Sequence, residues 1–349
     1  MLLVLIMAVV LWGVGAMLKT PKRLRWGMIG MLWLGVVLLH LILPDGHPLR
    51  MATGESAALW LLIGGFAAIV LAYRWGLRRL RTRVETRQEP EKKSSFSEAE
   101  LERYARHIVL REIGGPGQKA LKEAKVLVIG AGGLGSPVLM YLAAAGVGTI
   151  GVIDDDVVDN SNLQRQVIHR DADIGLPKVQ SAMQAMKAQN PNVEVRPYQR
   201  RLMPEVAEEL FADYDVILDG TDNFDSRYLA NATCVALGKP LISGALSQWE
   251  GQVSVFAPYL GTPCYQCIFP EAPAPGLAPS CAEAGVVGPL PGVVGSMMAV
   301  EAVKLISGAG QSLLGDMLIY DALWGETRKI VIHPRDDCPI CQKTKEKGA

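Results

Sequence analysis

Three apolar runs dominate the beginning of the chain, at Leu2–Leu18, Gly27–Leu43 and Ala57–Tyr73, and none of them contains Lys, Arg, Asp or Glu. Each run holds 17 residues, and about 17–25 are needed for a helix to cross a hydrocarbon core of ~30 Å. One run of this length is also typical of a buried core helix. Three in succession, separated by short polar turns, favour three membrane-spanning helices.

After about residue 95 the pattern changes to alternating helices and short strands. Ser97-Glu98-Ala99-Glu100 is a capping box, which predicts a helix that runs to about Leu110. Lys125–Ile129 is a continuous apolar run, typical of a buried parallel strand, and it is followed by glycines and an apolar helix over residues 136–146. Further strands are predicted at Thr149–Ile153, Asp215–Leu218, Leu241–Ser243, Val253–Phe256, Met317–Tyr320 and Arg328–Ile332, and further helices at Arg227–Leu237 and Pro289–Ser307.

This pattern predicts an α/β fold, a Rossmann-like doubly wound and mainly parallel sheet with an antiparallel C-terminal extension, preceded by three transmembrane helices. We expect a transmembrane module over residues 1–75, a basic juxtamembrane linker over 76–95 and an α/β domain over 96–349.

The charges divide unevenly between these parts, although 35 Lys and Arg balance 35 Asp and Glu in the whole chain. Residues 1–90 contain 11 basic and 4 acidic residues, a net of +7, so residues 91–349 carry 24 against 31, a net of −7. No nucleic-acid partner is predicted. The first loop is basic (Lys19, Lys22, Arg23, Arg25) and so is the segment after the third run, whereas the second loop holds only Arg50.

Basic loops stay on the cytoplasmic side of a membrane. We therefore expect a multi-pass protein of the cytoplasmic (inner) membrane, with its N-terminus outside and its α/β domain in the cytoplasm. A cleaved signal peptide is the alternative for the first run, but this run lacks a basic n-region and a small-residue cleavage site.

A glycine-rich turn follows the first predicted strand of the second part, with glycines at 130, 132, 133 and 135. Strand, glycine turn and helix in this order place backbone N–H groups at a helix N-terminus, where a phosphate binds. Asp154 ends the next strand, 19 residues after Gly135, and suits a ribose hydroxyl. Taken alone, this arrangement is typical of an NAD- or FAD-dependent oxidoreductase.

Polar and basic residues after Asp154 favour a different chemistry. Asn160-Ser161-Asn162-Leu163-Gln164-Arg165 precedes Pro177-Lys178, and Pro177 at a helix start would place Lys178 in the first turn. A dehydrogenase has little need for these groups, whereas an enzyme that attacks the α-phosphate of ATP needs cations for the charge that develops on oxygen. A solvated surface loop is the alternative interpretation.

An acidic turn, Asp219-Gly220-Thr221-Asp222-Asn223, follows the strand at residues 215–218. Ligands bind at the carboxyl ends of strands in such sheets, and Mg²⁺ prefers one or two carboxylates together with phosphate oxygens. We expect Asp222 to hold the metal and Asp219 to be structural.

Four of the six cysteines form two C-x-x-C pairs, Cys264 with Cys267 and Cys338 with Cys341, separated by 70 residues. Four thiolates in two such pairs suit a tetrahedral structural zinc, and a redox dithiol is the alternative for either pair alone. Cys281 lies in a Gly- and Pro-rich loop, and Cys234 is expected in the core.

The glycine turn, the SNLQRQ stretch, the G-x-P-K and D-G-T-D-N motifs and the two C-x-x-C pairs occur here in one order. This order closely resembles that of the ThiF/MoeB/HesA adenylyltransferases, relatives of the ubiquitin-activating enzymes, over residues 95–342. The resemblance implies that Arg165 and Lys178 contact the phosphates of ATP, that Asp222 binds Mg²⁺, and that Arg106 reaches into the site of a partner subunit in a homodimer. The nucleotide site that it implies comprises Gly130, Gly132, Gly133, Gly135, Asp154, Ser161, Asn162, Leu163, Gln164, Arg165, Lys178, Asp222 and Asn223.

The resemblance also implies a reaction, the adenylation of the C-terminal glycine of a small ubiquitin-like sulfur-carrier protein that ends in Gly-Gly, with release of pyrophosphate. The pathway would be of the molybdopterin (molybdenum cofactor) or thiamine type, the sulfur donor a separate protein, and Cys281 a candidate for a covalent link to the carrier. Two alternatives are an NAD-linked Rossmann oxidoreductase and a non-catalytic membrane scaffold that binds ATP.

Overall fold

The computed structural model describes residues 1–54, 56–85, 96–274 and 284–342. The chain forms two compact units, Met1–Ser94 and Ser95–Ala349, which are described separately.

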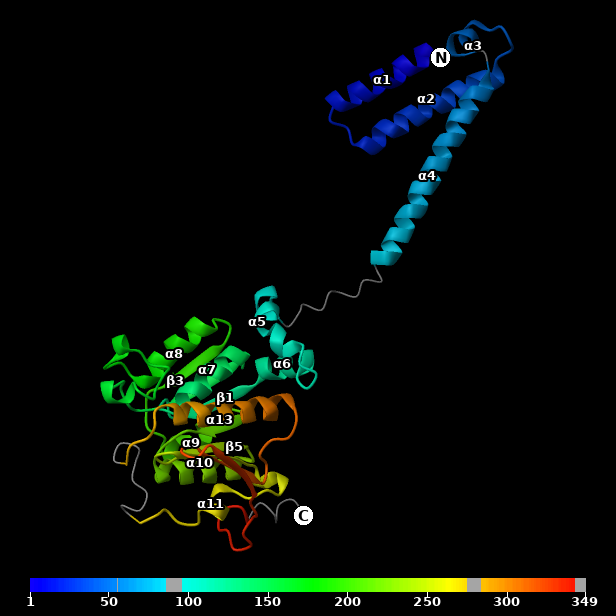
Figure 1. Ribbon diagram of the computed structural model, residues 1–349. Helices are drawn as coiled ribbons and strands as arrows, with labels where there is room; N and C mark the ends of the chain where they lie inside the picture. The colour runs from blue at the N-terminus through cyan, green and yellow to red at the C-terminus, as the bar shows by residue number, and fades with distance from the viewer. Residues whose placement is uncertain (55, 86–95, 275–283, 343–349) are drawn as a thin grey trace. The chain divides into compact units, whose positions relative to one another are not determined.

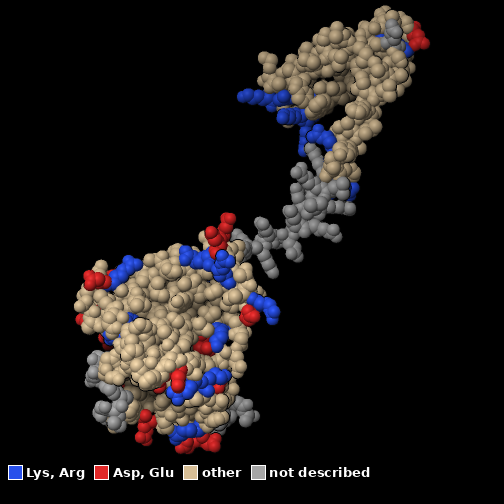
Figure 2. Space-filling model, viewed as in Figure 1, with Lys and Arg blue, Asp and Glu red and all other residues tan. Residues whose placement is uncertain are grey.

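The described residues of the first unit form the helices α1 (Leu2–Met17), α2 (Lys22–Ile42), the short α3 (Pro48–Thr53) and α4 (Ala57–Glu85) (Figure 1). Its small core contains Val4, Val36, Val37 and Trp60. Most other large apolar side chains of the unit are exposed, including Phe66 and Leu71 of α4. Figure 2 shows a surface that is mostly uncharged, with Lys and Arg gathered near the end at which α1 turns into α2.

Two helices of this unit, Lys22–Ile42 and the Ala57–Leu77 part of α4, are long and apolar enough to cross a membrane. The first predicted span forms an apolar helix of 16 residues, which is shorter than these two. Helix α4 continues without a break to Glu85 and so includes the first part of the segment expected to be a linker. A third helix of sufficient length, α13 (Pro289–Ser307), belongs to the second unit and packs in its core.

The second unit is built on an eight-stranded sheet with the strand order β3-β2-β1-β4-β5-β6-β7-β8. The strands β1 to β5 are parallel to one another, and β6 to β8 form an antiparallel extension, so the predicted fold class is confirmed. Their bounds are β1 (Lys125–Ile129), β2 (Thr149–Ile153), β3 (Glu194–Tyr198), β4 (Val216–Asp219), β5 (Leu241–Leu246), β6 (Glu250–Phe256), β7 (Asp316–Asp321) and β8 (Glu326–Val331).

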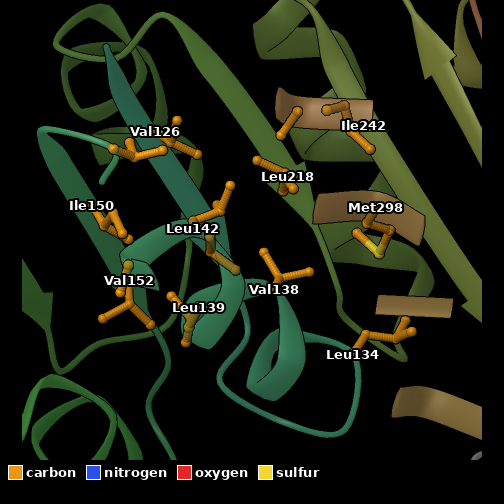
Figure 3. Close-up of a cluster of buried hydrophobic side chains, with 14 of the residues drawn as sticks. Val126, Leu134, Val138, Leu139, Leu142, Ile150, Val152, Leu218, Ile242 and Met298 are labelled. Carbon is orange, nitrogen blue, oxygen red and sulfur yellow. The ribbon is translucent and has the colours of Figure 1, made fainter. Parts of the chain in front are cut away.

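Helices cover both faces of the parallel part, as expected for strands with buried residues on alternate sides. One face packs against α7 (Gly135–Ala145), α8 (Lys178–Gln189) and α13, and the other against α9 (Pro204–Ala212) and α10 (Phe224–Leu237). Figure 3 shows Val138, Leu139 and Leu142 of α7 within the first of these cores, together with side chains of the sheet and with Met298 of α13.

Helix α5 (Glu98–Ile108) has the predicted capping box, because the Ser97 hydroxyl accepts from the Glu100 N–H and the Glu100 carboxylate accepts from the Ser97 N–H. It is followed by α6 (Gly114–Glu123). The elements β3 and α9 were not predicted. Strand β3 contains Pro197 and lies at an edge of the sheet, where a strand needs no apolar run.

Candidate active site

A cavity of about 800 Å³ opens at the carboxyl ends of β1, β2 and β4. The sheet places the glycine turn, the acidic residue after β2 and the acidic turn after β4 around this cavity, although they are distant in sequence. Its lining includes Gly130, Gly132, Gly133, Asp154, Asn162, Arg165, Lys178, Asp222 and Asn223.

The glycine turn joins β1 to α7 and is shaped by close backbone contacts. Gly130 has φ +92°, a region that side chains disfavour. A Cβ atom at Gly135 would lie 1.9 Å from the Gly130 carbonyl oxygen, so only glycine fits there. Gly135 therefore supports the turn from behind, while the other three glycines face the cavity. Helix α7 starts without a side-chain cap, but the Ser136 N–H already donates to the Gly132 carbonyl at 2.9 Å and Pro137 has no N–H, so the first turn of α7 offers few N–H groups to a ligand.

Asp154 is fixed against this turn. Its Oδ2 accepts from the Ala131 N–H at 2.8 Å and its Oδ1 accepts from the Asp156 N–H at 2.8 Å. Burial raises the pKa of this carboxyl, although the Ala131 N–H opposes the shift. The carboxylate is thus held at the edge of the cavity, in the position expected of a ribose ligand.

The two predicted cationic residues, Lys178 and Arg165, line the cavity from different elements. Lys178 begins α8 and its side chain is buried, with Nζ 2.7 Å from Asp156 Oδ2. Because the Asp156 side chain is 66% exposed, water can replace the lysine as its partner. Arg165 is held by the Ser161 carbonyl at 3.2 Å and by Asn162 Oδ1 at 3.0 Å. Both cations could therefore turn to phosphate oxygens at little cost.

The remaining predicted residues of the SNLQRQ stretch lie elsewhere. Ser161 donates its hydroxyl to Asp159, and Gln164 lies against Gly288. In the described part of the chain the cavity lining does not include Ser161, Leu163 or Gln164. Their nucleotide contacts stay predictions, and so does the role of Arg106, which is exposed on α5.

The turn after β4 carries two carboxylates with different surroundings, Asp219 and Asp222. Asp219 is buried, accepts from Thr221 N–H at 3.0 Å and lies 3.5 Å from the Arg227 guanidinium. Asp222 is exposed to the cavity, and no described residue forms a hydrogen bond with its carboxylate. Asn223 Oδ1 caps α10 by accepting from the Ser226 N–H at 2.9 Å. Asp222 is thus the carboxylate of this turn that fits a Mg²⁺ ion.

Several residues of the cavity were not found by sequence reasoning. Arg200 and Arg201 follow the unpredicted strand β3, and Tyr265 and Phe269 contribute an aromatic wall. The signal for the arginines would have been the alternating residues of β3. Nothing in the local sequence indicates that Tyr265 faces the nucleotide site.

The four cysteines of the C-x-x-C pairs meet in one buried cluster, in which all four sulfurs lie within 4.8 Å of one another. Cys264 Sγ lies 3.8 Å from Cys267 Sγ and 3.6 Å from Cys338 Sγ, and Cys267 Sγ lies 3.4 Å from Cys341 Sγ. Disulfide sulfurs are about 2.05 Å apart, whereas tetrahedral zinc at about 2.3 Å from each sulfur sets them about 3.8 Å apart. The donor set therefore fits zinc.

The thiol pKa shifts differ within the cluster. Burial and the neighbouring sulfurs raise the pKa of Cys264 to about 12. At Cys338 burial also opposes ionisation, but the backbone N–H groups of Cys341 and Ile340 lower the pKa to about 7. Zinc is bound by thiolates, so its binding to this cluster would displace the protons of the buried thiols.

The cysteine cluster and the cavity share a helix. Asn231 of α10 accepts from the Tyr265 N–H at 2.9 Å, directly after Cys264, while Val235 packs against the cysteines. Tyr265 lines the cavity, so the cluster fixes one wall of the site as well as the C-terminal segment.

Cys234 lies apart from the cluster. Cys234 is buried in the core on α10, where burial raises its thiol pKa. Cys281, the candidate for a covalent link, lies outside the described residues.

Sheet, glycine turn, fixed carboxylate and converging cations define a Rossmann-like nucleotide-binding domain. A family model described as "ThiF family" matches residues 104–340, and the chain belongs to this family.

Similar proteins agree with that assignment. A Mycobacterium tuberculosis protein named "Probable adenylyltransferase/sulfurtransferase MoeZ" is 53% identical over 249 residues, covering 70% of this chain and 64% of the relative. The chain therefore spans less than two thirds of that relative's length. The "Sulfur carrier protein adenylyltransferase" of Thermus thermophilus is 50% identical over 250 residues, covering 70% of this chain and 92% of the relative.

Solved structures share the fold at lower identity. Escherichia coli MccB, crystallised with MccA-N7isoASN, has a TM-score of 0.61 and 23% identity, and the match covers 68% of this chain and 74% of MccB. PaaA has a TM-score of 0.60 and 24% identity, with coverage of 86% and 90%.

Proposed function

We propose that the chain adenylates the C-terminal glycine of a small ubiquitin-like sulfur-carrier protein, with ATP as co-substrate and pyrophosphate as leaving group. The observation that carries the proposal is the convergence of Asp154, Arg165, Lys178 and Asp222 on one cavity beside a glycine turn. The names of the relatives, among them a sulfur carrier protein adenylyltransferase, support the same reaction. The molybdopterin or thiamine type of pathway and a separate sulfur donor belong to this proposal.

The reaction needs orientation and charge stabilisation more than proton transfer, because the C-terminal carboxylate is already ionised at neutral pH. Its oxygen forms a bond to the α-phosphorus while the bond from that phosphorus to the bridging oxygen breaks. Negative charge grows on the non-bridging oxygens and on pyrophosphate, where Lys178 and Arg165 can bind it. Asp154 would fix the ribose, and Asp222 would hold a Mg²⁺ ion that neutralises phosphate charge.

Partner subunits and zinc complete the proposal. In a homodimer Arg106 would add a cation to the site of the other subunit. The cluster formed by Cys264, Cys267, Cys338 and Cys341 would hold zinc, which would contribute stability rather than chemistry. Cys281 is proposed as the position of a covalent link to the carrier.

Exchange of labelled pyrophosphate into ATP tests the reaction, because it reports reversible adenylation without any later step. We expect exchange that requires both Mg²⁺ and a carrier ending in Gly-Gly. Absence of exchange with every such small protein of the host would refute the proposal. Tight binding of NADH without ATP binding would instead favour an oxidoreductase, and a lasting ATP complex without released pyrophosphate would favour a scaffold.

We further propose that the first unit anchors the enzyme in the cytoplasmic membrane, with α1, α2 and α4 as spans and the second unit in the cytoplasm. The support is the apolar exposed surface of this unit together with four basic residues at one end of the α1–α2 pair, Lys19 in the connecting turn and Lys22, Arg23 and Arg25 at the start of α2. The full chain should sediment with membranes and resist carbonate extraction, and residues 96–349 expressed alone should not. Recovery of the full chain in the supernatant would contradict the anchor.

A further inference from the structure

His169 lies behind the nucleotide cavity and has no role in the reaction proposed above. Its side chain is buried at 6% exposure, and its two ring nitrogens contact different elements. Nε2 lies 2.9 Å from the Ala131 carbonyl oxygen, in the glycine turn. Nδ1 lies 2.8 Å from the Ser181 hydroxyl, on α8.

The contact with Ala131 determines where the ring proton lies. A carbonyl oxygen only accepts, so Nε2 must carry a proton and donate it. Burial lowers the pKa of His169, although the bond to Ala131 opposes this shift. The Ser181 hydroxyl has one hydrogen, which it donates to Asp173 Oδ2 at 2.7 Å, so its contact with Nδ1 ties the ring to α8 without fixing a proton on Nδ1.

Both contacts lead to groups that face the nucleotide. The N–H of Ala131 is the donor that holds Asp154 Oδ2, so the imidazole and the carboxylate fix the same residue of the turn. Ser181 stands three residues after Lys178 and therefore lies on the same face of α8. The imidazole thus spans the gap between the glycine turn and the helix that carries the lysine.

We propose that His169 is a positioning residue for ATP, which holds the glycine turn through the Ala131 carbonyl and keeps this turn in register with Lys178 through Ser181. The inference rests on the proposed ATP site but not on the identity of the carrier. It assigns the imidazole a function in nucleotide affinity, beyond filling the core.

Two substitutions separate the two bonds. In His169→Gln the amide nitrogen reaches the position of Nε2, so donation to Ala131 is kept. In His169→Asn the amide reaches only the position of Nδ1, so the bond to Ala131 is lost and the one to Ser181 is kept. Both variants lose the ring, and because Asn is one methylene smaller than Gln, the melting temperature of each variant measures its packing cost separately from its ATP affinity.

Calorimetric titration of the full-length protein with Mg·ATP, together with the melting temperature, tests the proposal. We expect His169→Asn to raise the Kd for ATP about 10-fold, because a misplaced turn weakens several hydrogen bonds together, and His169→Gln to stay within about 3-fold of wild type. The KM for the carrier should not change in either variant. Equal ATP affinity of the Asn and Gln variants, whether both strong or both weak, would overturn the proposal.

A third variant, Ser181→Ala, keeps the test decisive if His169→Asn does not fold. It frees the ring from α8 while the imidazole remains, and it should weaken ATP binding about 3-fold; unchanged affinity would overturn the proposal. Wild-type protein that does not bind ATP at all would refute the proposed function itself, which is a different result from equal affinities of the variants.

Discussion

Lys178→Ala is expected to lower the rate of pyrophosphate exchange by about 10³-fold, the range found when one charge-stabilising group is removed from a transition state. The structure gives the reason: Nζ is held at the first turn of α8, buried at the cavity, with the mostly exposed Asp156 as its ion-pair partner. Without Lys178, no cation from the first turn of α8 would stabilise the negative charge that grows on the phosphate oxygens. The measurement is exchange at saturating ATP and carrier.

The fold should survive this change. Asp156 stays hydrated after the lysine is removed, so we expect the free energy of unfolding to change by about 1 kcal/mol or less. Lys187→Ala on the same helix is the matched control, since Lys187 is exposed and bonds the Val193 carbonyl away from the cavity. Exchange by Lys178→Ala within about 10-fold of wild type would contradict the role of Lys178.

Cys338→Ser is expected to lower zinc affinity by on the order of 100-fold or more and to lower the melting temperature by roughly 10 °C or more, because loss of a structural metal is among the largest single-residue effects. Cys338 is fully buried, and backbone N–H groups lower the pKa of its thiol to about 7. The cluster also fixes Tyr265 through α10, so ATP affinity should fall with the zinc. Zinc content per chain and thermal unfolding measure the two effects.

Cys234→Ala is the control for this experiment. Cys234 is also buried on α10 but lies in the core and not in the cluster, so its replacement should leave the zinc content unchanged and cost about 1–2 kcal/mol of packing. Full zinc occupancy in Cys338→Ser would refute the metal site. A chain without zinc but with an unchanged melting temperature would refute its structural role.

Local patterns were sufficient for the central elements of the sheet. The strands β1 and β2 are continuous apolar runs, and both were predicted at their observed bounds. Strand β3 lacks such a run, because an edge strand with polar residues and a proline satisfies its backbone without a buried face. Because β3 was not predicted, Arg200 and Arg201, which follow it, were not recognised as residues of the cavity.

Residue type alone did not show which side chains of a motif face the cavity and which are structural. Asp219 and Asp222 are three residues apart, yet one forms a buried pair with Arg227 and the other faces the cavity. Asn223 was expected to bind the nucleotide, and its side-chain oxygen caps α10. His169 belongs to none of the motifs described from the sequence, and its contacts with Ala131 and Ser181 emerge only in the fold. These distinctions depend on hydrogen-bond partners that lie on other elements.

The sequence by itself determined the order of motifs, the apolar spans and the presence of two cysteine pairs, since these depend on composition and on neighbours in the chain. Only the tertiary structure decided that Lys178 lines the same cavity as the glycine turn, which lies more than forty residues before it in the sequence. It also decided that the sulfur atoms of Cys267 and Cys341 lie 3.4 Å apart. Such contacts follow from the strand order of the sheet and from the packing of helices on both its faces. Both are set by burial of distant surfaces against each other, which local periodicity does not encode.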